Sequence, residues 1–289
     1  DNFKNIFENY NYINYQRVKN PYKWTEPSMT AFFSLEQEIY TEETKNLEKR
    51  VLKSNIGKTF PTLLKKEYNS ELLNELYEIG YDFKWVGNYS QNCSQTNYRY
   101  CLDNKKESYI DLYTLQAFLS KSPIVQIFDN ILGLSFVKNN FKMKILHSDA
   151  IWEINNYLDN NKKSINEIRP TFFFIHEMEA HEPYFVDSDC NFKRFQGKFN
   201  LDGYKNSYLC VIKKMSQVIK TIDKFDPEAI VVFQSDHNWI MSTRDESKFG
   251  YRNSIFSLIK NNEICKKEIP NNPNNLNTIK YFINCLKEQ

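Results

Sequence analysis

Glycine is scarce in this chain: only 7 of its 289 residues are glycine. Neither G-x-G-x-x-G nor G-x-x-x-x-G-K-[ST] occurs, so the glycine-rich loops that bind dinucleotides and nucleoside triphosphates are excluded. No run of 18 apolar residues is present, which excludes a membrane-spanning helix within this sequence. A charge excess is missing as well, because 38 Lys and Arg face 36 Asp and Glu, and we therefore expect no nucleic-acid partner.

The overall amino-acid composition is typical of a folded protein. Hydrophobic residues make up 41% and charged residues 26% of the chain, close to the values of ordinary globular domains. No internal repeat or low-complexity linker interrupts the sequence, so we assign residues 1–289 to a single domain. The chain begins at Asp1 without a Met or an apolar leader, and we expect it to be a processed or truncated part of a longer protein.

The six cysteines fall into three successive pairs. These are Cys93–Cys101, Cys190–Cys210 and Cys265–Cys285. As disulfides they would each close a loop of roughly 10–20 residues and contribute ~2–4 kcal/mol, and they would place the domain outside the cytoplasm. Six buried reduced thiols are the alternative, because free cysteine packs as a small hydrophobe.

Apolar residues follow two spacings along the chain. Helical spacing predicts helices that start at Glu26-Pro27 and that cover Thr62–Ile79, Leu112–Leu132, Ile145–Leu158, Tyr204–Phe225 and Asn277–Leu286. Short continuous apolar runs predict strands at Phe83–Val86, Thr171–Ile175, Ala229–Phe233 and Ser254–Ile259. Strands of this kind between helices predict an α/β fold, with helices on both sides of a mostly parallel central sheet.

One polar segment lies at a predicted helix start. In Trp24-Thr25-Glu26-Pro27-Ser28 a hydroxyl residue precedes the first turn. The N–H groups and dipole of such a helix favour an anion such as phosphate or sulfate. An ordinary N-cap is the alternative interpretation.

Two further polar segments follow predicted strands. His176 and His181 come after Thr171–Ile175, and Asp236-His237 comes after Ala229–Phe233. Ligands gather at the carboxyl ends of strands in open α/β sheets, and Asp and His offer oxygen and nitrogen ligands for zinc or manganese. Solvated loop histidines and an Asp that caps a turn are the alternatives.

The three segments together resemble the sulfatase-like group of the alkaline phosphatase superfamily over nearly the whole chain. The resemblance rests on T-x-P-S at a helix start, a strand followed by H-x4-H-x-P-Y, and a strand followed by S-D-H. It implies that Thr25 is the nucleophile, that Thr25, Asp236 and His237 bind one divalent ion, and that His181 is catalytic. The ion would be zinc or manganese first, with magnesium and calcium also compatible.

The same resemblance implies substrate-binding residues and shows departures from the family pattern. His176 and His181 would bind substrate, together with Lys248 in the loop after S-D-H, where Arg244 is a second candidate cation and plain surface charge is the alternative. Asn238 stands where the family has Gly. The family's N-terminal apolar strand, which ends in an acidic metal ligand, is missing from this sequence.

The cysteine placement resembles extracytoplasmic members that transfer phosphoethanolamine or phosphoglycerol groups. Sulfatases oxidise Cys or Ser to an aldehyde, which Thr25 cannot form. The resemblance therefore predicts a metal-dependent phosphoryl-group transferase or phosphoester hydrolase, with a sulfatase-type hydrolase and a non-catalytic binding domain as alternatives. It implies a phosphate- or sulfate-ester substrate, a phospholipid donor, a cell-envelope acceptor, and a periplasmic or cell-surface location with a membrane anchor outside this sequence.

Overall fold

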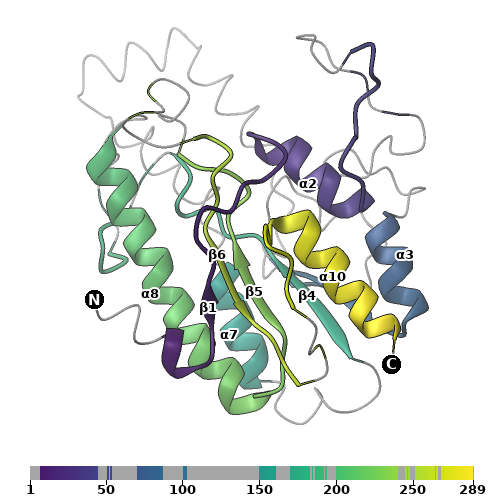
Figure 1. Ribbon diagram of the computed structural model, residues 1–289. Helices are drawn as coiled ribbons and strands as arrows, with labels where there is room; N and C mark the ends of the chain where they lie inside the picture. Colours follow the sequence, from purple (N-terminus) through teal and green to yellow (C-terminus); the bar gives the residue numbers. More distant parts are fainter. Residues whose placement is uncertain are drawn as a thin grey trace, which may run out of the picture.

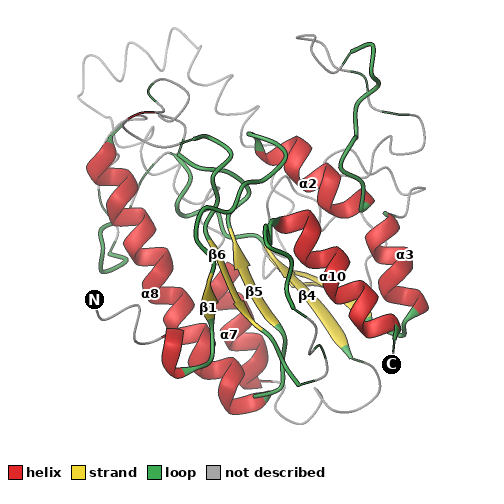
Figure 2. Cartoon of the chain, viewed as in Figure 1, coloured by secondary structure: helices red, strands yellow, loops and turns green. Residues whose placement is uncertain are grey.

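The structure is a computed structural model with side chains. It describes residues 7–44, 51, 53, 70–86, 100–102, 150–160, 170–182, 184, 186–191, 193, 200–239, 245, 247, 251–263, 265 and 268–288. Helices and short strands alternate along this part of the chain, and the strands lie centrally with helices on both sides (Figures 1 and 2). The described part is therefore a mixed α/β fold.

One of the two described sheets is parallel. Its strand order is β3-β2-β4, and its strands are β2 (Asp82–Val86), β3 (Tyr100–Leu102) and β4 (Thr171–Ile175). Trp85 of β2 is paired with Cys101 of β3 on one side and with Phe174 of β4 on the other. β4 is thus an edge strand of this sheet, and all five of its residues are half-buried.

The other described sheet is antiparallel. Its strand order is β1-β6-β5, and its strands are β1 (Ile13–Asn14), β5 (Val231–Gln234) and β6 (Ser257–Lys260). Ile259 of the central strand β6 is paired with Ile13 on one side and Val232 on the other. All four residues of β6 are buried, because strands flank it on both edges.

In the described part of the chain, five helices cover the strands. They are α2 (Thr25–Ser34), α3 (Glu71–Glu78), α7 (Ala150–Asn160), α8 (Leu201–Phe225) and α10 (Asn275–Lys287). α7 and α8 share a core with residues from both sheets, including Val86 and Leu258. α2, α3 and α10 form a second core around Trp85. Successive residues of a strand point to opposite faces, so Trp85 and Val86 place the two cores on opposite sides of β2.

The described helices and strands lie close to the predicted residues, but the described strands do not show the predicted sheet. The described strands form one parallel and one antiparallel sheet of three strands each, and they show no mostly parallel central sheet. β6 runs back along β5, and an apolar run does not specify strand direction. The predicted helix at Leu112–Leu132 and the first part of Thr62–Ile79 lie outside the described residues.

Two of the three predicted disulfides are confirmed. Cys190 and Cys210 are bonded with Cα atoms 5.0 Å apart, and Cys265 and Cys285 are bonded with Cα atoms 5.7 Å apart. The third predicted pair includes Cys93, which lies outside the described residues. Disulfides persist in oxidising compartments, so the two bonds indicate an extracytoplasmic domain.

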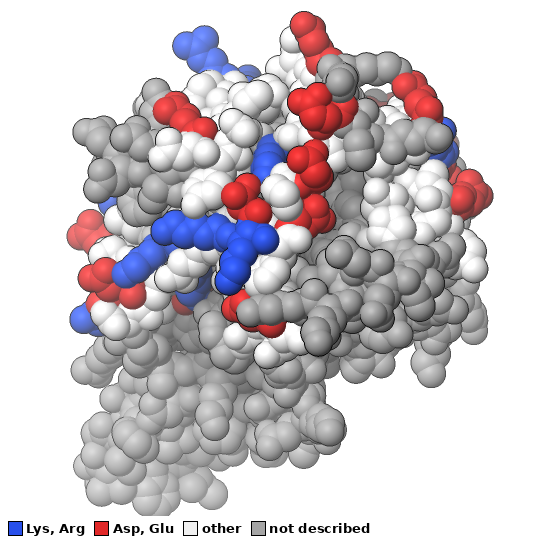
Figure 3. All heavy atoms as spheres, turned by 90° about the horizontal axis from the view of Figure 1, so that it is seen from below, with Lys and Arg blue, Asp and Glu red and all other residues white. Residues whose placement is uncertain are grey.

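The described helices and the face shown in Figure 3 bear on the expected lack of a membrane span and of a charge excess. None of the described helices is long and apolar enough to cross a bilayer. On the face seen from below, Lys and Arg lie among Asp and Glu (Figure 3), which agrees with the net charge of +2.

Candidate active site

The first residue of α2 directs its hydroxyl to the loop after β5. Trp24 is the N-cap residue and makes no side-chain capping hydrogen bond, so Thr25 is already helical. Thr25 Oγ1 lies 3.0 Å from Nε2 of His237. The sequence placed this hydroxyl one residue before the helix, but the helix begins at Thr25 itself, and the side chain is available to His237.

The loop that carries Asp236 and His237 is fixed by the N-terminal part of the chain. Asn20, which is buried, donates from Nδ2 to the carbonyl oxygen of Asp236 at 2.7 Å. Ser28 on α2 donates to the same carbonyl at 3.3 Å. The backbone N–H of His237 donates to Oδ1 of Asp236 at 2.9 Å, which orients the carboxylate. Asn20 and Ser28, which precede Asp236 by more than 200 positions, therefore hold Asp236 directly and His237 through it.

The surroundings of His237 lower the pKa of its ring. Burial lowers its pKa, the nearby guanidinium of Arg252 lowers it further, and Asp236 opposes this shift. Its Nδ1 lies 2.9 Å from the carbonyl oxygen of Asn238. The ring thus faces Asn238 on one side and Thr25 on the other.

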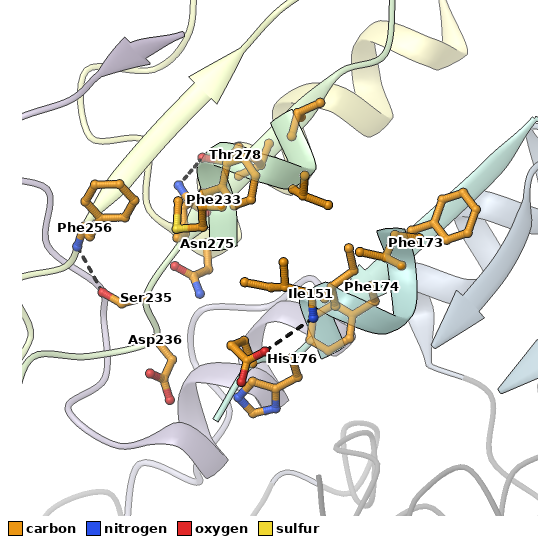
Figure 4. Close-up of a pocket in the computed structure, with 18 of the residues that line it drawn as sticks. Ile151, Phe173, Phe174, His176, Phe233, Ser235, Asp236, Phe256, Asn275 and Thr278 are labelled. Carbon is orange, nitrogen blue, oxygen red and sulfur yellow. Dashed lines mark hydrogen bonds between the residues drawn. The ribbon is translucent and has the colours of Figure 1, made fainter. Parts of the chain in front are cut away.

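His176 and His181 lie in the same cavity as Thr25, Asp236 and His237. Figure 4 shows His176 and Asp236 near one another at one end of this cavity, away from Phe173. Burial lowers the pKa of His176; Asp236 opposes this, and the two other histidines of the cavity add to it. His181 is exposed, and its Nδ1 lies 2.5 Å from the carbonyl oxygen of Glu182.

Four contacts fix the loop between His176 and Cys190. Glu177 accepts hydrogen bonds from the N–H of Ile151, at the start of α7 (Figure 4), and from that of Glu179. Glu179 forms a buried ion pair with Lys214 of α8. Beyond His181, the disulfide Cys190–Cys210 joins the chain to α8 a second time.

An aromatic group supports the site from the side of α8. Trp239 donates from Nε1 to the hydroxyl of Tyr184 at 2.7 Å and stacks on Tyr204 with ring centroids 5.0 Å apart. A Cβ on Gly203 would lie 3.0 Å from the Tyr184 ring, a tight contact that glycine avoids where α8 approaches Tyr184. This packing fixes the chain directly after His237.

Sequence reasoning missed Arg252, which lies between Tyr251 and Asn253 just before β6. Its side chain is only 3% exposed. Its guanidinium lies over the exposed ring of Trp24, 4.9 Å from the centroid, and reaches the backbone on both sides of the site. An isolated Arg before an apolar run gives no signal of this role. The cations that the sequence favoured, Arg244 and Lys248, lie outside the described residues.

The donor atoms fit part of a divalent-ion site. Nε2 of His237 lies 3.0 Å from Thr25 Oγ1 and 3.4 Å from Oδ2 of Asp236. Ligands at about 2.0–2.1 Å from a tetrahedral ion lie roughly 3.3 Å from each other, so the spacing around Nε2 suits one ion. Within the described ranges, no group of three or more His, Cys, Asp and Glu is placed to hold a metal. Asp236 and His237 would therefore need the threonine oxygen and a further donor.

Comparison with known families matches one of them over most of the chain. The sulfatase family model covers residues 10–263, a range that includes Thr25, His181 and Asp236-His237. No curated protein and no solved structure matches the chain significantly.

Proposed function

The chain belongs to the sulfatase family of the alkaline phosphatase superfamily, and we propose that it is a metal-dependent phosphoryl-group transferase or phosphoester hydrolase in which Thr25 is the nucleophile. The family implies an enzyme acting on phosphate or sulfate esters. The observation that carries the finer proposal is the distance of 3.0 Å between Thr25 Oγ1 and His237 Nε2.

The side chains around Thr25 support a nucleophilic role. Nδ1 of His237 donates to the carbonyl of Asn238, so Nε2 is left to accept the hydrogen bond of the Thr25 hydroxyl. In the metal-free protein this bond orients the oxygen; a bound ion would use the same lone pair and would hold the oxygen in its place. Asp236, His237 and the threonine oxygen would hold a divalent ion, zinc or manganese before magnesium or calcium. When bound, such an ion lowers the pKa of a coordinated hydroxyl.

The reaction follows from these placements. Thr25 Oγ1 gives its proton to water and forms a bond to phosphorus, and the bond from phosphorus to the leaving oxygen breaks. His181, an exposed residue that lines the cavity, gives a proton to the leaving oxygen. His176 hydrogen-bonds the ester, and Lys248 would add a cation. An acceptor alcohol or water then takes the group from Thr25.

Threonine favours phosphoryl transfer over sulfate-ester hydrolysis. Oxidation of Thr25 gives a ketone, whereas the sulfatase mechanism requires an aldehyde made from Cys or Ser. Together with the disulfides, this supports an extracytoplasmic enzyme, and we propose a phospholipid donor, a cell-envelope acceptor and a membrane anchor in the full-length protein. A sulfate-ester hydrolase and a non-catalytic binding domain are the competing functions.

A substrate panel with mass spectrometry tests the proposal. Full-length protein loaded with Zn²⁺ or Mn²⁺ is incubated with p-nitrophenyl phosphate, bis-p-nitrophenyl phosphate, p-nitrophenyl sulfate and phospholipid vesicles. We expect turnover of phosphate esters and a mass increase on Thr25. Turnover of the sulfate alone would favour the sulfatase, and no turnover with any ester would favour the binding domain.

Two threonines of α2 give a matched pair of variants. Thr25→Ala should abolish turnover, whereas Thr30→Ala should keep it, because the Thr30 hydroxyl donates to the carbonyl of Glu26 in its own helix. Thr25→Ser should retain activity, since it keeps the hydroxyl. Wild-type turnover by Thr25→Ala would exclude Thr25 as the nucleophile.

A further inference from the structure

We infer that Arg252 is a positioning residue that keeps the proton of His237 on Nδ1 and so presents the Nε2 lone pair to Thr25. The consequence for catalysis rests on the proposed function, but the position of the proton can be measured without any substrate.

The guanidinium of Arg252 reaches three separate acceptors. Nε donates to the carbonyl of Lys23 at 3.1 Å, and Nη1 donates to the carbonyl of Asn238. Nη2 lies 3.3 Å from Nε2 of His237. The side chain thereby joins the segment before α2, the loop after β5 and the residues before β6, at a position shielded from solvent.

The third contact bears on which nitrogen of His237 carries the proton. Oδ2 of Asp236 lies 3.4 Å from Nε2 and would accept a proton placed there, but arginine has N–H donors and no acceptor, so that proton would also face the N–H of Arg252. A proton on Nδ1 faces the carbonyl of Asn238 at 2.9 Å instead. Arg252 and Asn238 therefore favour the same arrangement from opposite sides of the ring.

Arginine suits this position for geometric reasons. Asn238 accepts from both His237 and Arg252 through one carbonyl, which fixes the ring and the guanidinium relative to each other. The planar guanidinium supplies several N–H donors in fixed directions, whereas the ammonium group of lysine is a compact charge on a flexible side chain. Stacking over Trp24 at 4.9 Å limits rotation of the guanidinium further. A lysine cannot reach the three acceptors at once.

The result for Thr25 is a directed hydrogen bond. With the ring proton on Nδ1, Nε2 can only accept, and the Thr25 hydroxyl at 3.0 Å becomes the donor. With the proton on Nε2 the ring would donate to Thr25 and occupy an oxygen lone pair that the attack needs. The same Nε2 lone pair is the one that a divalent ion would use.

Nitrogen-15 NMR of the histidine rings tests the inference. The chain has four histidines, so a sample labelled only at histidine gives few signals, and His237→Gln identifies the one that belongs to His237. Spectra are recorded with and without EDTA, at a pH where the ring is neutral. We expect the Nδ1–H pattern in the wild type under both conditions, and an increased share of Nε2–H in metal-free Arg252→Lys and Arg252→Ala.

Kinetics give a second readout. Loss of such a supporting contact costs about 10- to 100-fold in activity or metal affinity. We expect kcat to fall by that factor in Arg252→Ala, and added guanidinium chloride at millimolar concentration to restore part of it. Arg17→Ala, which removes an exposed arginine, should behave as wild type in both assays.

The outcomes separate this inference from the proposed function. A wild-type ring protonated at Nε2, or an unchanged tautomer in metal-free Arg252→Ala, would overturn it. If Arg252→Ala does not fold, the spectra of the wild type and of Arg252→Lys still test the inference. The Nδ1–H pattern in a protein that turns over no ester would leave the inference standing and reject the proposed function.

Discussion

Separate removal of the two disulfides should reduce stability equally but activity unequally. Both bonds join cysteines 20 positions apart. In the chain-entropy treatment, a loop of that length constrains the unfolded chain by roughly 11 cal/mol/K, or about 3 kcal/mol at 25 °C. Replacing either pair by two alanines removes the same atoms, so each variant controls for the other.

The two bonds differ in what they hold. Cys190–Cys210 joins the chain beyond His181 to α8, on the same helix as the Glu179–Lys214 ion pair. Cys265–Cys285 joins the chain after β6 to α10, within a separate apolar cluster. We expect the first variant to lose roughly 10- to 100-fold in kcat/KM, because a small displacement of a catalytic group has effects of this size. The second should keep wild-type kcat/KM while it is folded.

Urea denaturation and initial rates at a temperature where both variants are folded provide the measurements. Free energies of unfolding that differ by more than about 1 kcal/mol between the variants would refute the loop-entropy reasoning, provided that the m-values agree. Equal loss of kcat/KM in both variants would refute the placement of His181 by Cys190–Cys210.

Three further predictions concern single side chains. Asn20→Ala should lower turnover and should lower the free energy of unfolding by about 1 kcal/mol. The partly buried carbonyl of Asp236 loses its shorter hydrogen bond and keeps the longer one from Ser28. Thermal unfolding and initial rates measure these two effects. Lys214→Met should lower the free energy of unfolding, measured in urea, by about 3–5 kcal/mol, because Glu179 stays buried and loses this ion pair. A free energy of unfolding equal to that of the wild type would contradict this prediction. Burial raises the pKa of Tyr204 to about 12, so the folded state binds more protons than the unfolded state above pH 10. Stability should be full below pH 10 and fall as pH rises toward 12, and Tyr204→Phe should flatten that fall in unfolding curves.

Local patterns in the sequence predicted most described elements. Thr171–Ile175 is a strand at the predicted residues, and α8 begins only three residues before the predicted Tyr204. Gly80 ends α3 with a positive φ of 86°, as its lack of a side chain allows. Periodicity and turn residues act over a few positions, so the sequence carries this information directly.

The missed features depend on distant partners. β1 has only Ile13 and Asn14, both exposed, and it is extended because it pairs with β6. The antiparallel direction of β6 likewise depends on its pairing with β5. Arg252 owes its role to Lys23, Asn238 and His237, which no local spacing connects to it. By contrast, the sequence indicated the region of Thr25 and Asp236-His237, because strand ends and helix starts are predictable places for polar groups.

The hydrogen bond from Asn20 to Asp236 joins two residues that the ribosome adds at very different times. Thr25 precedes His237 by 212 residues and Asn20 precedes Asp236 by 216. At about 5–20 residues per second, the ribosome adds the second member of each pair roughly 10–40 s after the first. During that interval the nascent N-terminal segment has neither β6 nor the Asp236 loop to pair with. A ribosome-bound chain that ends before residue 236 should therefore be inactive and expose the start of α2 to proteases.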